Sequence, residues 1–248
     1  MGEGALRSIR RFRLSVVLGL AIGSTALIAL PANAATPTLA GIDVSHHNGD
    51  IDWAQVKAAG TRFVIAKVTE ATTFVDDHYA ANKLQVEALG MAFTGYHFAQ
   101  PDASRGDAVA EADFFIANAH LTGKNLVPVL DLERSNALGV KKLTRWTRDW
   151  LNEVHAKLGV KPIIYTTTPF WKTHLGNSTW FAANGYPLWI AHWTSAAQPT
   201  LPASNWGGHG WTLWQYANDG SVDGIATAVD LDRFNGTALG SLKIKNNR

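Results

Sequence analysis

The sequence predicts an α/β fold, a closed eight-stranded (β/α) barrel with few helices in its last third. Short apolar, β-branched segments alternate with amphipathic segments, a pattern that favours parallel strands joined by right-handed helical crossovers. Eight strand candidates fall within about 200 residues, which suits one barrel. An open doubly-wound sheet is the alternative. Its nucleotide-binding form lacks support because no GxGxxG or GxxxxGK[ST] motif follows a strand.

Helix candidates separate the first five strand candidates. These strands are expected at residues 39–45, 62–70, 91–99, 125–133 and 161–168, and the helices at residues 52–60, 78–90, 107–119 and 141–159. Asp50 or Asp52 can cap the first helix, and Gly60 can end it. The longest helix is indicated by apolar residues at spacings of three and four, namely Leu143, Trp146, Trp150, Val154 and Leu158.

The alternation weakens after residue 168. Three further strands are expected at residues 186–193, 210–217 and 227–234. The connections between them are rich in Gly, Asn and Ser and show no clear long helix. We therefore expect helices to be missing or reduced around the last three strands.

The first 34 residues have the pattern of a secretory signal peptide. A basic start with Arg7, Arg10, Arg11 and Arg13 precedes an apolar run at residues 14–30. Ala32 and Ala34 then occupy the small positions of an A-x-A cleavage site, so the mature chain should begin near Ala35. We expect a secreted, extracellular protein with no membrane association after cleavage. An uncleaved membrane anchor is the alternative.

Composition excludes several kinds of function. The signal segment holds four of the 22 basic and one of the 20 acidic residues, which leaves 18 basic and 19 acidic residues in residues 35–248. Such a balance does not favour a nucleic-acid partner. The chain has no cysteine, so thiolate chemistry and cysteine–zinc sites are excluded. All ten tryptophans follow the signal segment, where they can fill a core or line a groove for sugar rings.

Polar residues gather where the expected strands end. In order along the chain these are Asp43, Ser45, His46 and His47; Lys67 and Glu70; Tyr96 and His97; Asp131 and Glu133; Tyr165; Trp189 and His192; Gln215 and Tyr216; and Asp230 and Asp232. In (β/α) barrels the carboxyl ends of the strands form one face, where active sites lie. The acids of the first, second, fourth and eighth strands should therefore meet at one mouth.

Asp131 and Glu133 are two residues apart on a strand, so both side chains should point to the same side. Two close carboxylates cannot both ionise freely, and the pKa of one of them rises. A protonated acid beside an ionised one is the pair that glycoside hydrolysis uses. A structural cluster with Arg134, Lys67 or Arg62 is the alternative interpretation.

Metal and serine chemistry have weaker signals. His46 and His47 could bind zinc with Asp43, but adjacent strand residues point to opposite faces and no HExxH motif is present. No serine lies in a G-x-S-x-G elbow. We therefore expect neither a metal nor another cofactor.

Eight segments, in order, resemble glycoside hydrolase family 25, the Ch-type lysozymes. They are GIDVSHHNGDIDW at 41–53, AKVTEATTFVD at 66–76, GYHFA at 95–99, PVLDLE at 128–133, PIIYT at 162–166, LWIAHW at 188–193, LWQY at 213–216 and VDLDRFNG at 229–236. The resemblance implies one catalytic domain at residues 35–248, with its core at about 41–236, and a flattened, modified TIM-like barrel. The chain departs from the family pattern at Ala71, where Gly is usual, and at Asp232, where Asn is frequent.

The family resemblance also implies a reaction, hydrolysis of the β-1,4 bond between N-acetylmuramic acid and N-acetylglucosamine in peptidoglycan glycan strands. Glu133 would be the general acid/base. Asp131 would orient the substrate's 2-acetamido group or stabilise positive charge, with Asp43 and Asp230 as further acids. Sugar contacts would come from the residues Tyr96, Tyr165, Trp189, Trp214 and Glu70. We expect a monomer.

Three other functions are open at this point: an inactive carbohydrate-binding protein on the same barrel, a chitinase-like glycosidase, and a zinc-dependent sugar deacetylase. Retention of all four acids argues against the first. The chitinase D-x-x-D-x-D-x-E signature is absent from the chain, which has only its final D-x-E. Retaining, inverting and substrate-assisted routes all remain open, since they depend on the distance between carboxylates.

Overall fold

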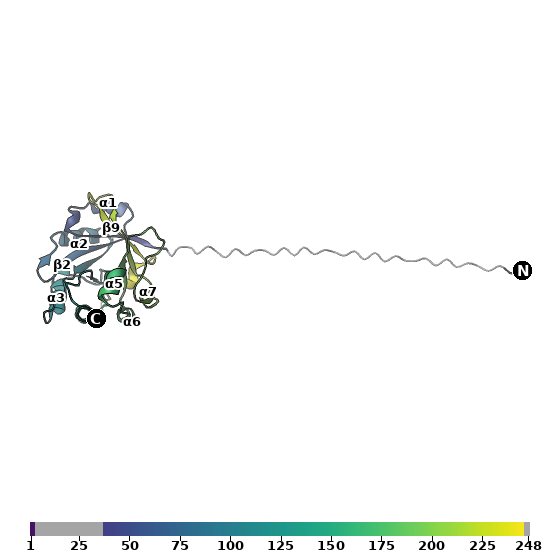
Figure 1. Ribbon diagram of the computed structural model, residues 1–248. Helices are drawn as coiled ribbons and strands as arrows, with labels where there is room; N and C mark the ends of the chain where they lie inside the picture. Colours follow the sequence, from purple (N-terminus) through teal and green to yellow (C-terminus); the bar gives the residue numbers. More distant parts are fainter. Residues whose placement is uncertain (3–36, 246–248) are drawn as a thin grey trace. The chain divides into compact units, whose positions relative to one another are not determined.

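The computed structural model describes residues 1–2 and 37–245 (Figure 1). Within these residues, eight strands close into a barrel. They are β1 (Leu39–Val44), β2 (Phe63–Glu70), β4 (Ala92–Phe98), β5 (Val129–Asp131), β6 (Ile163–Thr167), β7 (Leu188–Ala191), β8 (Leu213–Gly220) and β9 (Val229–Phe234). The ring runs β1-β9-β8-β7-β6-β5-β4-β2 and is closed by the pairing of β1 with β2. The expected barrel is thus confirmed. The predicted signal peptide, apart from Met1 and Gly2, lies outside the described residues.

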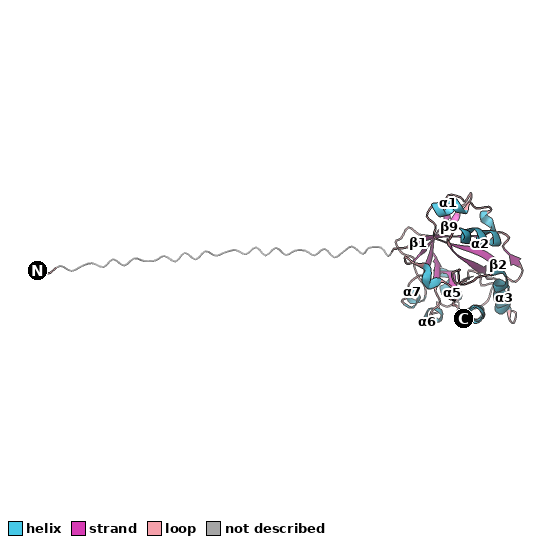
Figure 2. Ribbon diagram, turned by 180° about the vertical axis from the view of Figure 1, so that it is seen from behind, coloured by secondary structure: helices cyan, strands magenta, loops and turns pink. Residues whose placement is uncertain are grey.

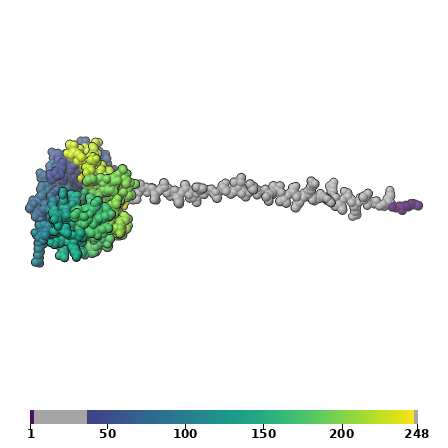
Figure 3. Space-filling model, viewed as in Figure 1, coloured from purple at the N-terminus to yellow at the C-terminus, as the bar shows by residue number. Residues whose placement is uncertain are grey.

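The sheet is mixed rather than all parallel. Seven neighbouring strands of the ring pair in parallel, whereas β9 runs antiparallel to both β8 and β1. A ninth strand, β3 (Phe74–Val75), adds antiparallel to β2 outside the ring. In the space-filling view (Figure 3), the early blue and late yellow segments of the domain lie side by side, as the pairing of β1 with β9 requires.

Helices surround the strands (Figure 2). Four follow the expected pattern: α1 (Trp53–Ala58), α2 (Tyr79–Ala88), α3 (Asp107–Ala119) and α4 (Val140–Leu158). Asp52 caps α1, where its carboxylate accepts the N–H groups of Ala54 and Gln55 at 3.0 and 3.1 Å. Later helices are short, namely α5 (Thr168–His174), α6 (Trp180–Ala183) and α7 (Ala203–Gly207), as expected for the last third. No helix of the described residues is long and apolar enough to cross a membrane.

The core has two layers because strand residues alternate between two faces. On β7, Leu188 and Ile190 pack outward against the helices, whereas Trp189 and Ala191 pack inward within the barrel. The same alternation turns Asp43 on β1 inward, between the outward residues Ile42 and Val44. Strand periodicity therefore decides which polar side chains reach the barrel interior.

Gly41 allows the barrel to close at the seam between β1 and β2. It lies opposite Phe63, and a Cβ atom at Gly41 would come within 2.2 Å of the Phe63 ring, which is fully buried. We expect Gly41→Ala to lower the free energy of unfolding by about 1–3 kcal/mol, because the ring must leave its packed position. Urea denaturation would measure the effect. An unchanged denaturation midpoint would show that the seam tolerates a methyl group. The matched control is Gly240→Ala, because a Cβ atom at Gly240 would meet no other atom within 4 Å.

Candidate active site

A cavity of about 530 Å³ opens at the carboxyl ends of the parallel strands. Its walls are formed by Asp43, Ser45, His47, Lys67, Glu70, Tyr96, Phe98, Gln100, Asp131, Glu133, Arg134, Tyr165, Trp189, Trp193, Gln215, Asn218 and Asp230. Of the acids expected at one mouth, the structure brings together Asp43, Glu70, Asp131, Glu133 and Asp230, whereas Asp232 is buried and does not line the cavity. Of the residues expected to contact sugars, it also places Tyr96, Tyr165, Trp189 and Glu70 in this cavity.

Asp131 ends β5 on the inward face of the barrel, between the buried residues Leu130 and Leu132. Its carboxyl is buried, and its Oδ1 has no hydrogen-bond donor among the described residues. Burial raises the pKa of Asp131 well above its usual range, and the nearby Glu133 carboxylate raises it further. A buried oxygen without a donor is costly, so Asp131 is prepared to accept a hydrogen bond from a ligand.

Glu133 lies two residues beyond Asp131, half-buried at the same wall of the cavity. Burial raises its pKa above the ordinary value for a glutamate. The neighbouring Arg134 acts in the opposite direction, and the Asp230 carboxylate adds to the rise. A partly exposed carboxyl with a raised pKa can keep a proton and still deliver it to a ligand.

Asp43 and Asp230 form the opposite wall of the cavity. Their Cα atoms are paired across β1 and β9, so the two acids lie side by side. Burial is the main cause that raises the pKa of both acids. The carboxylates of Asp232 and Asp230 raise the pKa of Asp43 further. Gln215 Nε2 donates to Asp43 Oδ2 at 2.8 Å. This wall can hold negative charge next to a ligand.

Lys67 brings a buried positive charge to the cavity. Its Nζ donates to Glu70 Oε2 at 2.6 Å and lies 4.8 Å from the centre of the Phe98 ring. Burial alone would raise the pKa of Glu70, but the hydrogen bonds from Lys67 and Gln100 leave it below its ordinary value. Gln100 Nε2 donates to Glu70 Oε1 at 2.9 Å. Glu70 is thus held as an ionised wall residue.

The turn after Glu70 places Ala71 in a conformation that favours glycine. Ala71 has φ 50°, in the left-handed region that glycine adopts most easily. Its N–H donates to the carbonyl of Phe98, which ties the turn to the neighbouring strand β4. The departure from the family pattern therefore costs local strain.

Aromatic side chains cover one side of the cavity. Tyr165 and Trp189 pack edge to face with ring centres 4.5 Å apart, and both rings are almost completely buried. Trp193 is different, because 54% of it is exposed while its Nε1 donates to Gln215 Oε1 at 3.1 Å. An exposed indole held in a fixed position is a suitable platform for a sugar ring.

Trp214 is placed elsewhere than we expected. It is 1% exposed, its Nε1 donates to the His192 carbonyl, and it packs in the outer layer of the core. The cause is strand alternation on β8, which turns Gln215 inward and Trp214 outward. Within the cavity, Trp193 takes the place we had expected for Trp214.

The histidine pair lies in a short 3₁₀ turn, His46–Asn48, and not on a strand. His46 Nδ1 is 2.8 Å from Asp76 Oδ2, while His47 reaches the cavity wall. Among the residues that the structure describes, no three His, Cys, Asp or Glu side chains form a group that could hold a metal ion. The described residues therefore offer no set of ligands for the zinc site considered from the sequence.

His97 is a buried wall residue. Its Nδ1 lies 2.8 Å from Thr69 Oγ1, its Nε2 lies 2.6 Å from Glu111 Oε2, and its ring stacks on Trp150. Glu111 Oε2 also accepts the backbone N–H of Gln100. This network fixes Gln100 and, through it, Glu70 at the cavity wall.

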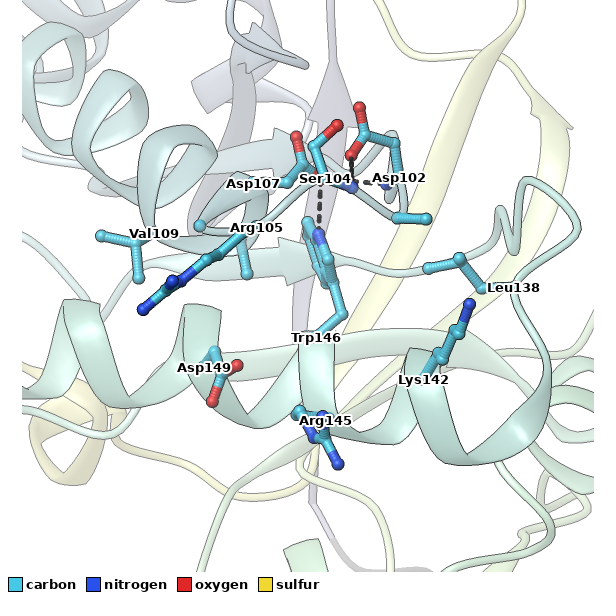
Figure 4. Close-up of a pocket in the computed structure, with 13 residues that line it drawn as sticks. Asp102, Ser104, Arg105, Asp107, Val109, Leu138, Lys142, Arg145, Trp146 and Asp149 are labelled. Carbon is cyan, nitrogen blue, oxygen red and sulfur yellow. Dashed lines mark hydrogen bonds between the residues drawn. The ribbon is translucent and has the colours of Figure 1, made fainter.

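A second cavity, of about 340 Å³, lies between the start of α3 and the first turns of α4 (Figure 4). Asp107 Oδ2 accepts the Trp146 indole N–H at 2.7 Å and so joins the two helices. Arg105, Lys142 and Arg145 are mixed there with three acids, and none of these side chains is buried. This cavity lacks the buried carboxyls that distinguish the first one.

Paired carboxyl groups beside an exposed indole, at the active-site face of a (β/α) barrel, are the groups that a glycoside hydrolase uses. The model of glycosyl hydrolases family 25 matches residues 42–225. Lysozyme M1 of Streptomyces globisporus is 39% identical over 221 residues, covering 86% of this chain and 73% of that protein. The N,O-diacetylmuramidase of a Chalaropsis species is 32% identical over 212 residues, covering 78% of this chain and 96% of the other.

A solved structure agrees with these matches. The bacterial lysozyme of Streptomyces coelicolor superposes with a TM-score of 0.77 and 36% identity, covering 84% of this chain and 98% of that one. The chain belongs to glycoside hydrolase family 25, and it is an enzyme of the lysozyme type. The family match ends before β9, so the placement of Asp230 rests on the β1–β9 pairing.

Proposed function

We propose that this enzyme cleaves the β-1,4 bond between N-acetylmuramic acid and N-acetylglucosamine in the glycan strands of peptidoglycan. The observation that carries the proposal is the cavity itself, where Asp131 and Glu133 face Asp43 and Asp230 beside the exposed Trp193. The names of the relatives, a lysozyme and a muramidase, support this choice of substrate.

Glu133 is the proton donor in this proposal. Its proton passes to the glycosidic oxygen as the bond from that oxygen to the anomeric carbon breaks, and the leaving sugar departs as a neutral alcohol. Water then supplies the hydroxyl of the new reducing end, and its proton returns to Glu133. The half-buried position and raised pKa of Glu133 support this role.

Asp131 is assigned to the substrate's 2-acetamido group. Its buried Oδ1 has no donor among the described residues, and an amide N–H of the sugar would supply one. A hydrogen bond there would turn the acetamido oxygen toward the anomeric carbon, where it can stabilise or attack the developing positive charge. Asp43 and Asp230 would add negative potential on the other side of the ring.

The pH dependence of the reaction follows from Glu133. Because the donor must carry its proton, kcat/KM should fall as pH rises through the raised pKa of Glu133. Arg134 holds that pKa down, so Arg134→Gln should move the alkaline limb of the profile upward by a few tenths of a pH unit, and less at high salt. Arg105→Gln, which lies outside this cavity, is the control. A limb that stays in place or moves down would argue against Glu133 as the donor.

We also propose that the protein is exported and that residues 35–248 form a single catalytic domain, active as a monomer. The described residues 37–245 belong to one compact unit, which supports a single domain. Mass spectrometry of the protein from culture medium should give a chain that starts at Ala35. Recovery of the full-length chain from the membrane fraction would contradict export by cleavage.

The enzyme as a whole is tested on purified cell walls. Protein that begins at Ala35 should clear a wall suspension and release reducing sugar in proportion to time and enzyme amount. Clearing without new reducing ends would indicate that a bond outside the glycan is cut.

A further inference from the structure

Asp232 is an acid with no place in the proposed reaction. It lies on β9 inside the barrel, is 0% exposed and does not line the cavity. Its Cα is paired with Gly41 on β1 and with Gln215 on β8, which makes it the diagonal neighbour of Asp43 on the same face. Asp232 and Asp230 both act on the pKa of Asp43 as close carboxyl neighbours, so the three acids form one cluster.

Each of the two acids accepts one N–H donor from a neighbouring strand. Trp189 Nε1 donates to Asp232 Oδ1 at 2.8 Å, whereas Asp232 Oδ2 is buried without a donor among the described residues. Gln215 Nε2 donates to Asp43 Oδ2. Every N–H donor that reaches the two carboxyl groups is therefore accounted for, and none serves Asp232 Oδ2.

The orientation of Gln215 is fixed by its other partners. Its Oε1 accepts the Tyr165 hydroxyl at 3.0 Å and the Trp193 indole N–H at 3.1 Å. Its amide group must therefore point to Asp43, and it cannot turn to serve Asp232. A proton held between the two carboxyls would satisfy Asp232 Oδ2.

The charges nearby also favour such a proton. From β1 and β9, Asp43 and Asp230 face Asp232, while β8 and β7 contribute the neutral side chains of Gln215 and Trp189. No basic side chain of the described residues forms an ion pair with any of these three acids. Two buried negative charges in contact, without a cation, would be strongly unfavourable.

We propose that Asp232 is a positioning residue that shares one proton with Asp43, so that the pair carries a single negative charge and holds Asp43 in a fixed orientation at the cavity wall. The inference rests on the proposed function only for the role of Asp43. Burial raises the pKa of Asp232 to about 8, in agreement with a proton retained at neutral pH. The pair resembles two carboxyls that titrate as one unit.

Asp232→Asn tests the shared proton. Asn can still accept from Trp189 through Oδ1, and its amide donates permanently to Asp43, where wild type uses a titratable proton. In the folded wild type the pKa of Asp232 is raised, so the native state binds more protons than the unfolded state, and stability falls as pH rises from about 4 to 8. Between pH 6 and pH 9 the Tm of the full chain should drop by about 5 °C more in wild type than in Asp232→Asn.

Infrared spectroscopy gives a second readout that does not depend on substrate. Wild type at pH 6 should show a protonated carboxyl band that is absent from Asp232→Asn and that disappears from wild type by pH 9. Equal Tm slopes and the same carboxyl bands in both proteins would overturn the proposal. Because neither measurement uses substrate, a wrong substrate assignment would leave this test intact.

The variant Asp232→Leu tests whether Asp232 positions Asp43 or only fills space in the core. It removes both polar contacts at nearly constant volume, so kcat/KM on walls should fall at least 10-fold, and Asp232→Asn should recover most of that loss. Equal rates for the Leu and Asn variants would rule out a positioning role. If the Leu variant does not fold, the Tm and infrared comparisons between wild type and Asp232→Asn still decide.

Discussion

Glu133→Gln is expected to lower kcat/KM for wall hydrolysis by about 10³-fold, within the range that general acid catalysis contributes. Gln keeps the size and polarity of the side chain but has no proton to transfer to the glycosidic oxygen. Because Glu133 is half-buried and accepts no hydrogen bond from another described residue, the fold should not depend on its charge. Release of reducing sugar from purified walls, with circular dichroism as the check on folding, measures both effects.

A substrate with a good leaving group provides the control for this variant. An aryl glycoside whose phenol leaves as an anion needs little protonation, so Glu133→Gln should retain a far larger share of activity on it than on walls. An equal loss on both substrates would indicate that Glu133 contributes binding or structure. Full activity on walls would transfer the role of proton donor to another acid.

Asp131→Asn should show the second largest effect, a fall in kcat of about 10²-fold or more. Asn places an amide where the substrate's acetamido N–H would donate, so the group that assists the reaction is no longer held. Although kcat falls, the stability of the folded Asp131→Asn variant should increase. Burial and Glu133 raise the pKa of Asp131, so its ionisation destabilises the native state increasingly as pH rises above about 4.

Asp131→Asn removes the charge of Asp131, so the variant's Tm at pH 7 should be a few degrees higher than that of wild type. Thermal melts at pH 4 and pH 7, set beside the rates, distinguish a functional acid from a structural one. A variant that is both active and less stable would show that Asp131 serves the fold. Asp113→Asn is a matched control, because Asp113 is a half-buried acid on α3 that lies outside both cavities and pairs only with Lys157 among the described residues.

Strand periodicity was sufficient to predict most of the barrel and its acids. A period of two places Asp43, Asp131 and Asp230 on the inward face, and the carboxyl ends of the parallel strands β1 and β5 bring Asp43 and Asp131 to one mouth. Asp230 reaches the same mouth from the start of the antiparallel strand β9. The direction of β9 could not be read from its residues, since parallel and antiparallel strands share the same alternation. Strand β3 was missed because two residues carry no period.

The aromatic and amide contacts were harder to predict than the acids. Trp214 and Gln215 are adjacent, and the choice of inward face depends on a register that the sequence does not display. The exposure of Trp193 arises from the loop after β7, where no periodic signal applies. Gln215 stood among the strand-end residues, yet its contacts with Asp43, Tyr165 and Trp193 emerge only when the barrel closes.

The central claim is the bond that is cut, and analysis of the new reducing ends tests it most directly. Purified walls are digested, the products are reduced with borohydride and hydrolysed, and the reduced amino sugars are separated. Cleavage by the proposed reaction predicts reduced muramic acid in amounts that match the reducing sugar released. Reduced glucosamine in its place would contradict the assignment and make the enzyme a glucosaminidase.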